Sequence, residues 1–510
     1  MTAEDLKQQQ ALQLEIIRFL TEHAFLWDDK AGYAERGDII ETHGATVLLG
    51  PGKAIKLKKP VLYDHMDFST PEKRRFFCTR ELSFNKRGAP DLYDTLLTVS
   101  LTEDGTFNLS DQGIAIDYLV RMQRFAPEAQ LDQLAENTGL PGELLDQLTD
   151  KIASYHQTAD VIEDSSKIPP FSSVIDQNFI QMDSFCPELL DLQEVQDFRE
   201  SLHKMATSHS PLLEKRRRKG WIRRGHGDLH LQNICQMEDG PVLFDAIEYQ
   251  DDFVIGDILY DLAFLLMDLW ERGFRQEAGH VLNRYLLKMG WMDNPETLEA
   301  LVFLPFYLAM RAGIRTHVAA NRYFQSATLK DKRLLADRTH RLFKSAQSYL
   351  SPSAPRLIAI GGFSGSGKST LAGLLASHIS PPPGAIRLRS DEVRRQLIGW
   401  DDYSPMPQDA YTPEMSNKTY RLIEQSAFTL LNAGHSVIMD AVLDRPKDQA
   451  AIEQIAKDAG VSFHGIWLDV SKDVMAQRIE SRKNDASDAT VSVLEQQLTK
   501  NHKKNERWHI

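Results

Sequence analysis

The sequence has few cysteines, no excess of basic residues and no unbroken apolar run long enough to cross a membrane. Its 510 residues include three cysteines, which are too few and too widely spaced for a disulfide framework or a zinc site and therefore favour a reducing compartment. The formal net charge of −13 argues against a nucleic-acid or anionic-membrane partner, because either would favour a basic surface. The most apolar stretches, near residues 258–270 and 301–310, are too short or too interrupted to span a bilayer. Together with a polar first segment that lacks the features of a secretory signal, these absences predict a soluble cytoplasmic protein.

The length predicts more than one domain. The hydrophobic content of 42% and the charged content of 26% are typical of ordinary globular protein. Residues 351–355 read SPSAP, and a Ser/Pro segment between two periodic regions is typical of a linker. We therefore expect a first unit at residues 1–350 and a second at residues 351–510.

The first unit is expected to begin with a small β-rich part and to continue as a helical body. Residues 45–49 and 53–58 flank a Gly-Pro-Gly turn, which predicts a β-hairpin. Residues 69–72 (STPE) carry helix-start chemistry, and the helix should run to about Arg87, where Gly88 would take a left-handed stop position. Helical patterns then dominate from residue 245 to about residue 350. This layout predicts a bilobal, kinase-like α+β fold.

Five side chains of the first unit follow the order of a kinase active site. Residues 226–233 (HGDLHLQN) place Asp228 and Asn233 five positions apart, as in a catalytic loop whose Asp deprotonates the acceptor hydroxyl and whose Asn binds Mg²⁺. Asp245 ends an apolar strand and is expected to supply a second Mg²⁺ ligand. Lys56 would reach the nucleotide phosphates, and Glu81 would pair with Lys56 and hold it in place.

Each of these assignments has an alternative. Lys56 stands among Lys53, Lys58 and Lys59, which also suits a solvated strand. Glu72 competes with Glu81 for the ion pair, and Glu248 could share the metal-binding role of Asp245.

The second unit contains a complete P-loop. Residues 362–369 (GFSGSGKS) follow an apolar run and open a helical pattern, which is the order required for amides at a helix N-terminus to enclose phosphates while the lysine neutralises their charge and the final serine binds Mg²⁺. The expected nucleotide-binding residues are Gly362, Ser364, Gly365, Ser366, Gly367, Lys368, Ser369 and Thr370, with Ser369 also a metal ligand.

Further chemistry follows the P-loop. Asp391 is expected to be the base for an acceptor hydroxyl and Arg394 to hold an anionic part of the acceptor, although Asp391 would also suit a helix cap. Asp440 ends an apolar strand and would hold Mg²⁺, although strands often end in Asp for turn reasons. Arg478 and Arg482, four residues apart on one expected helix face, would form a lid over the phosphates or else a solvated basic face.

Four short apolar runs alternate with helical patterns in the second unit, at residues 357–360, 385–388, 436–439 and 463–468. Such alternation predicts an α/β domain with a parallel sheet flanked by helices.

The two units resemble two known groups of kinases. Residues 355–510, through the P-loop, the SDEVR element and the arginine pair, resemble small P-loop kinases of the gluconate kinase-like and zeta toxin-like group, and this stretch leaves no room for the modules of a mechanical AAA motor. Residues 35–340, through HGDLHLQN and GDILYDLA (residues 256–263), resemble aminoglycoside phosphotransferase-like kinases rather than protein kinases, since they lack a glycine-rich GxGxxG loop and a DFG triplet. The whole chain resembles bacterial fusions of these two parts.

The resemblance implies two sites that transfer the γ-phosphate of ATP, with Mg²⁺, to hydroxyls of small metabolites or sugars. Two alternatives stay open: one unit catalyses while the other is an ATP-binding regulator, or the second unit is a zeta toxin-like kinase of a nucleotide sugar.

Overall fold

The computed structural model describes residues 2–32, 38–63, 66–292, 294–351, 354–400, 404–482, 485–499 and 508–509. The chain divides into two compact units, Met1–Pro169 with Gly220–Asp261, and Pro170–Lys219 with Leu262–Ile510. We call them unit 1 and unit 2. The linker near residue 351 therefore lies inside unit 2, partly outside the described residues, and the division at residue 350 stays a prediction.

A six-stranded antiparallel sheet forms the first part of unit 1, in the order β1-β2-β3-β8-β6-β7. The expected hairpin is confirmed, since residues 45–49 pair with residues 54–58 and Val47 lies opposite Lys56. The strands are β1 (Asp38–Glu41), β2 (Ala45–Leu49), β3 (Lys53–Lys58), β6 (Tyr93–Leu101), β7 (Phe107–Asn108) and β8 (Ile114–Gln123).

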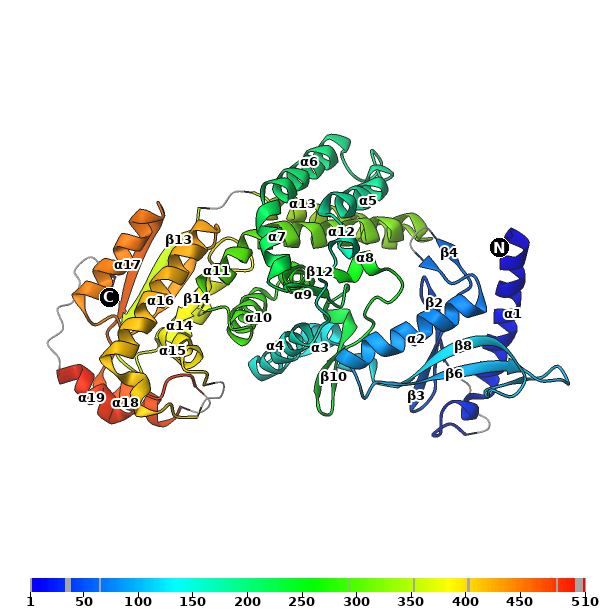
Figure 1. The fold of residues 1–510 in the computed structure, drawn as a ribbon, viewed down its shortest axis with the longest axis horizontal. Coiled ribbons are helices and arrows are strands. Elements are labelled where there is room, and N and C mark those ends of the chain that lie inside the picture. Colours follow the sequence, from blue (N-terminus) through cyan, green and yellow to red (C-terminus); the bar gives the residue numbers. More distant parts are fainter. Residues whose placement is uncertain are drawn as a thin grey trace. The chain divides into compact units, whose positions relative to one another are not determined.

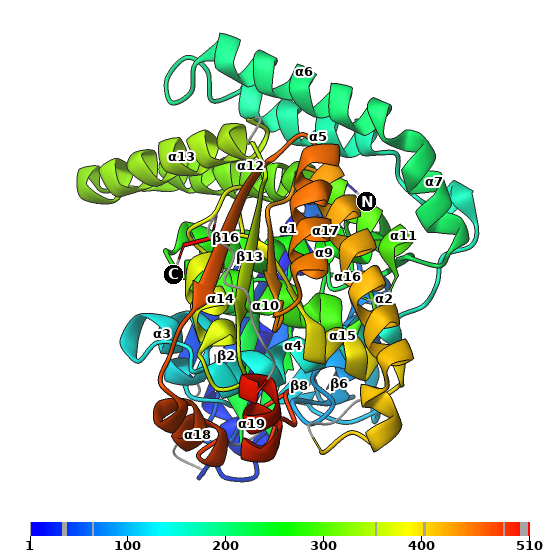
Figure 2. The ribbon, with the colours of Figure 1, turned by 90° about the vertical axis from the view of Figure 1, so that its left-hand side faces the viewer.

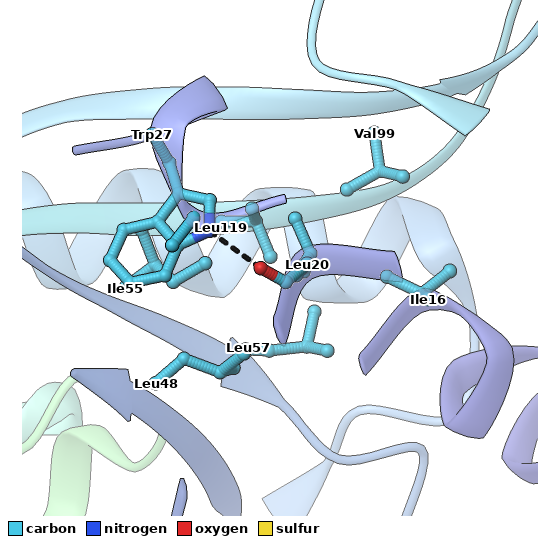
Figure 3. Close-up of a cluster of buried hydrophobic side chains, with 9 residues drawn as sticks. Ile16, Leu20, Trp27, Leu48, Ile55, Leu57, Val99 and Leu119 are labelled. Carbon is cyan, nitrogen blue, oxygen red and sulfur yellow. Dashed lines mark hydrogen bonds between the residues drawn. The ribbon is translucent and has the colours of Figure 1, made fainter. Parts of the chain in front are cut away.

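Helix α1 (Ala3–Glu22) covers one side of this sheet and fixes which way the β3 side chains point. It begins with a capping box in which Thr2 and Asp5 bond each other's backbone amides. Its apolar side chains and Trp27, whose indole N–H donates to the Leu20 carbonyl at 2.9 Å, pack in one buried cluster with Ile55 and Leu57 (Figure 3). Because successive side chains of a strand alternate between its faces, Lys56 and Lys58 project away from this cluster.

Helix α2 (Pro71–Gly88) packs across β6 and β8 (Figure 1). Its expected start is confirmed, with Thr70 as the capping residue that accepts from the Lys73 amide. The expected role of Gly88 is wrong, because this residue is the last of the helix and has no positive φ; the capping residue that follows, Ala89, has a φ of −141°. Gly88 is needed for a different reason: a Cβ there would lie 2.4 Å from the carbonyl oxygen of Leu243.

Gly88→Ala is therefore expected to destabilise the protein by about 1–3 kcal/mol, since a backbone atom has to move to admit the methyl group. Urea unfolding followed by circular dichroism measures the change. Gly142→Ala is the matched control, because Gly142 also lies in a helix of unit 1 but a Cβ there has no neighbour within 4 Å. Equal stabilities of the two variants would contradict the close approach of α2 and Leu243.

The rest of unit 1 holds short antiparallel strand pairs and several helices. β9 pairs with β12, and β10 pairs with β11. Residues 226–233 lie between β9 and β10, so the loop is anchored by a strand at each end. These elements are α3 (Leu131–Asn137), α4 (Gly142–Gln157), β9 (Ile222–Arg224), η4 (Leu231–Asn233), β10 (Ile234–Met237), β11 (Gly240–Leu243), α8 (Asp251–Val254) and β12 (Ile255–Asp257).

Unit 2 begins with helices, and those from α9 to α13 confirm the helical patterns predicted after residue 245. α12 and α13 lie side by side (Figures 1 and 2). The stretch Pro295–Gln325 is long and apolar enough to cross a membrane by composition, but 78% of its most apolar window is buried inside the protein. The helices are α5 (Phe171–Asp183), α6 (Leu192–Ser208), α7 (Ser210–Arg218), α9 (Ile258–Glu271, which starts in unit 1), α10 (Arg275–Lys288), α11 (Pro295–Leu298), η5 (Glu299–Phe303), α12 (Leu304–Gln325) and α13 (Leu329–Tyr349).

A four-stranded parallel sheet flanked by helices comes next along the chain, in the order β14-β15-β13-β16. This confirms the α/β expectation, and all four predicted runs are strands. β13, β14 and β15 end side by side at the segments that carry the P-loop, Asp391 and Asp440. The elements are β13 (Arg356–Gly362), α14 (Lys368–Ala376), β14 (Ile386–Arg389), α15 (Ser390–Leu397), α16 (Pro413–Asn432), β15 (Val437–Asp440), α17 (Pro446–Asp458), β16 (Ser462–Leu468), α18 (Lys472–Glu480) and α19 (Val491–Thr499).

Candidate active sites

The loop of residues 226–233 is held in shape by hydrogen bonds to its own backbone. The carboxylate of Asp261 accepts from the amides of His226 and Gly227 at 2.7 and 2.9 Å. The side-chain amide of Asn233 donates to Asp228 twice, to Oδ2 at 2.8 Å and to the backbone carbonyl at 2.9 Å. The structure thus brings Asp228 and Asn233 together in a fixed arrangement.

His226 is fully buried and anchors the start of this loop. Its Nε2 lies 3.0 Å from the Phe244 carbonyl oxygen. Burial lowers the pKa of His226, although Asp261 and Asp228 oppose this effect, so the ring is neutral and donates to that carbonyl. A metal-binding role for this histidine does not follow from its surroundings.

Lys56, Glu81 and Asp245 meet beside the loop. Lys56 Nζ lies 2.7 Å from Glu81 Oε1 and 2.6 Å from Asp245 Oδ1. Burial opposes the charge on Lys56, but the carboxylates of Asp245 and Glu81 outweigh burial and raise the pKa of Lys56 well above its ordinary value. Asp245 has a φ of 61°, a left-handed conformation that is uncommon for residues other than glycine and is often found at functional sites.

A second lysine completes this network and was not expected from the sequence. Lys58 is buried, not solvated, and donates to Glu81 Oε2 at 2.6 Å and also to Glu248. Glu248 is therefore buried and paired with Lys58, whereas the carboxylate of Asp245 is half-exposed; a shared metal role for Glu248 stays a prediction. The competing residue Glu72 is exposed at the start of α2, where its own backbone amide and Thr70 lower its pKa.

In unit 2, the P-loop connects β13 to α14 as predicted. Gly365 has a φ of 81°, and a Cβ there would lie 2.4 Å from the Met475 carbonyl oxygen, so only glycine fits. Lys368 Nζ donates to the Phe363 carbonyl at 2.9 Å, so the lysine lies folded over its own loop. Burial lowers the pKa of Lys368, against the opposing effects of Asp440 and Asp391.

The P-loop forms one wall of a cavity of about 890 Å³. Of the residues predicted for this site, only Gly362 is not among those that line the cavity. The lining residues that the sequence predicts are Ser364, Gly365, Ser366, Gly367, Lys368, Ser369, Thr370, Asp391, Arg394, Asp440, Arg478 and Arg482.

Arg394 lies in this cavity wall without a carboxylate partner among the described residues. Its Nη1 donates to the Ala410 carbonyl at 2.8 Å, and its guanidinium lies over the Tyr411 ring, 5.1 Å from the centroid. Its Nε is buried and has no hydrogen-bond partner in the described part of the chain. A buried cation in this state has unused capacity for an anion.

The arginine pair is arranged differently from the prediction. α18 ends at Glu480, so Arg478 is helical and Arg482 lies beyond the end of the helix. A single helix face for both residues is therefore wrong, although both line the cavity. Arg478 Nη1 donates to the Ser366 carbonyl at 3.1 Å, which links α18 directly to the P-loop.

Two carboxylates and one arginine in this wall were missed by the sequence reasoning. Arg389 lies 2.5 Å from Asp485 and 3.7 Å from Asp440. Asp488 accepts from Arg395 at 2.6 Å and from the Tyr411 hydroxyl at 2.8 Å. The pairs Arg389–Asp485 and Arg395–Asp488 connect the segment after α18 to the end of β14 and to α15. No short motif signals them, because the partners are 96 and 93 positions apart.

Comparison with known proteins finds two families in the chain. A family model described as "Phosphotransferase enzyme family" matches residues 88–301, and one described as "AAA domain" matches residues 357–502. The chain is 30% identical over 465 residues to the Mycobacterium tuberculosis protein Rv2004c, covering 89% of this chain and 88% of that one. Adenylyl-sulfate kinase of Myxococcus xanthus is 30% identical over 129 residues, which is 25% of this chain and 64% of the relative. An ethanolamine kinase of Plasmodium vivax superposes with a TM-score of 0.42 at 8% identity, covering 66% of this chain and 88% of that one.

The protein is thus an ATP-dependent kinase that joins an aminoglycoside phosphotransferase-like part to a P-loop kinase part. It belongs to the same family of two-part proteins as the mycobacterial protein Rv2004c.

Proposed function

We propose that the protein is a tandem phosphotransferase, in which two separate sites each move the γ-phosphate of ATP to a hydroxyl of a small metabolite or sugar. The observation that carries the proposal is that each unit gathers its own group of the side chains predicted to bind phosphate. In unit 1 these meet around Lys56, and in unit 2 they line the cavity beside Lys368. We also propose that the two functional domains are residues 1–350 and 351–510. The protein acts in the cytoplasm and binds neither nucleic acid nor membrane.

At the first site, Asp228 is the base that takes the proton from the acceptor hydroxyl. Asn233 holds its carboxylate oxygen at 2.8 Å, which orients the carboxylate before the substrate arrives. Lys56 is already charged and fixed between Glu81 and Asp245, so it can stabilise phosphate charge without reorganisation. The acceptor oxygen attacks the γ-phosphorus as the bond to ADP breaks, and the hydroxyl proton passes to Asp228.

At the second site, the amides of residues 364–369 enclose the phosphates and Lys368 neutralises them. Lys368 would leave the Phe363 carbonyl when phosphate binds, which exchanges a neutral acceptor for an anionic one. Asp391 accepts the proton of the acceptor hydroxyl, and the guanidinium of Arg394 in the cavity wall binds an anionic group elsewhere on the acceptor. Arg478 and Arg482 contact the transferring phosphate from the segment around the end of α18.

The residues present fit Mg²⁺ at both sites. Asp245 is half-exposed, and its Oδ2 has no partner among the described residues, since Lys56 takes Oδ1. Asp245 with Asn233 would hold the ion at the first site, and Ser369 with Asp440 at the second. Such a small ligand set suits Mg²⁺, which keeps several waters and binds through nucleotide phosphates. When bound, the ion offsets the charge that develops on the phosphates.

The test is transfer of label from γ-labelled ATP into a bacterial metabolite extract, with separation and identification of the products. Adenylyl sulfate is added in a parallel reaction as a defined acceptor, because one relative is named as an adenylyl-sulfate kinase. We expect two labelled products, one absent with Asp228→Asn and the other absent with Lys368→Ala. Each variant serves as the control for the other site.

Other outcomes would assign the alternatives. One alternative predicts a single labelled product that is lost in only one variant, together with ATP binding at the site that gives no product. The unit with that second site would then be a nucleotide-binding regulator. A labelled nucleotide sugar lost with Lys368→Ala would favour the zeta toxin-like alternative. Products that persist in both variants would contradict the proposed function.

A further inference from the structure

Helix α10 of the phosphotransferase-like part contacts the P-loop sheet through one buried asparagine. Asn283 is 5% exposed. Its Oδ1 accepts from the Arg387 amide at 2.6 Å, and its Nδ2 donates to the Ala385 carbonyl at 3.4 Å. Within α10, Nδ2 also donates to the Gly279 carbonyl at 2.8 Å, which fixes the rotamer.

These two bonds imitate a neighbouring strand. β14 is the edge strand of the sheet and, within the described ranges, pairs only with β15. An edge strand presents unpaired amides and carbonyls, and residues i and i+2 of a strand point their backbone groups to the same side. One carboxamide therefore bonds two backbone groups on the open side of this strand, the Ala385 carbonyl and the Arg387 amide. α10 packs beside β14 and α14 (Figures 1 and 2).

Three further side chains attach this region to the P-loop domain. Gln396, near the end of α15, donates to the Leu287 carbonyl of α10. Ser426 of α16 donates to the Met292 carbonyl at 3.2 Å, and His435 ahead of β15 lies 2.7 Å from the Leu301 carbonyl oxygen. Ser426 and His435 are completely buried. Residues 279–301, which the phosphotransferase family model includes, thus form part of the scaffold of the second site.

The position of Asn283 matters because β14 leads directly into α15. The strand ends at Arg389, and α15 starts at Ser390 with no intervening loop. A shift of β14 along its axis therefore moves Asp391 and Arg394 with it. β15 lies between β14 and β13, the strand that leads into the P-loop.

We infer that Asn283 is a positioning residue for the second active site: by fixing β14 it sets where the acceptor-facing residues Asp391 and Arg394 stand relative to the P-loop. The inference rests on the proposed function of that site. The first kinase part would then have a structural role in the second reaction, in addition to its own catalysis.

The test compares Asn283→Ala with wild type in the full-length protein by hydrogen exchange and by transfer of label. In the variant we expect amides of residues 386–394 to exchange about tenfold faster, because a buried hydrogen-bond pair is lost, while those of residues 357–362 are unchanged. Protection by ATP against thermal unfolding should be retained. The labelled product that Lys368→Ala abolishes should form about tenfold more slowly, and the product that Asp228→Asn abolishes should form at the wild-type rate.

Asn178→Ala is the matched control, because Asn178 donates to the carbonyl of Val174, one turn earlier in its own helix α5. Asn283→Asp keeps the acceptor for the Arg387 amide and replaces the alanine variant if that variant does not fold. Exchange at residues 386–394 in Asn283→Asp should be faster than in wild type and slower than the rate expected for Asn283→Ala. Unchanged exchange at these residues, or a global rise that includes residues 357–362, would overturn the inference. Absence of any Lys368-dependent product in wild type would instead refute the proposed function, while the exchange data would still decide the role of Asn283.

Discussion

Glu81→Ala is expected to lower the free energy of unfolding by about 3–5 kcal/mol, the usual cost of removing one partner from a buried ion pair. The side chain is completely buried and lies between two lysines, at 2.7 Å from Lys56 and 2.6 Å from Lys58. Its loss would leave Lys58 with Glu248 alone and Lys56 with Asp245 alone. The first site would also lose the fixed lysine, so its transfer of label should fall together with stability.

The same network predicts how the effect depends on pH. Burial would raise the pKa of Glu81, but Lys56 and Lys58 outweigh it and lower the pKa from 4.5 to about 2. A carboxyl whose pKa is depressed by folding contributes stability above its unfolded pKa and loses it as the pH falls toward its folded pKa. A shift of this size corresponds to about 3 kcal/mol. The difference between wild type and Glu81→Ala should therefore be full at pH 7 and shrink between pH 4.5 and pH 2.

Urea unfolding at a series of pH values measures this difference. Glu72→Ala is the control, because Glu72 begins the same helix but is exposed, and its removal should cost less than about 1 kcal/mol as for other surface carboxylates. If the two variants were equally stable at pH 7, the buried Lys–Glu–Lys arrangement would be wrong.

Much of this arrangement follows from local sequence. The alternation of β3 places Lys56 and Lys58 on one face, and the start of α2 at Thr70 fixes the turn on which Glu81 lies. The motif spacing of residues 226–233 and of the P-loop likewise determines local geometry, because a tight loop between regular elements has few conformations. These parts of both sites were therefore predictable from short windows of residues.

The features that could not be predicted depend on partners that are distant in the chain. Lys58 reads as one of several lysines on a strand, and only the fold places Glu248 beside it, 190 positions away. The close approach of Gly88 to Leu243 and the bonds between Asn283 and β14 have the same origin. A helix periodicity also says little about where a helix stops, which is why Arg482 lies outside α18 although its spacing from Arg478 fits one face.

The clearest test of chemistry at the first site is Asp228→Asn, for which we expect a fall of about 10²–10⁴-fold in the first labelled product, the usual contribution of a general base. The substitution preserves shape: an asparagine oxygen can replace Oδ2 and continue to accept from Asn233, which lies 2.8 Å away. ATP affinity should change less than about threefold, because Lys56, Glu81 and Asp245 keep their contacts with one another.

Rates of label transfer and ATP-dependent thermal shifts are measured on the same preparations. The first reports loss of catalysis and the second reports loss of ATP binding. Asp239→Asn removes a carboxylate from the exposed turn between β10 and β11 and should alter neither quantity. A loss of ATP binding in parallel with transfer would show that Asp228 shapes the nucleotide site rather than taking the proton. Unchanged transfer with intact ATP binding would make unit 1 a nucleotide sensor, and would leave the Lys368-dependent reaction as the whole catalytic function of the chain.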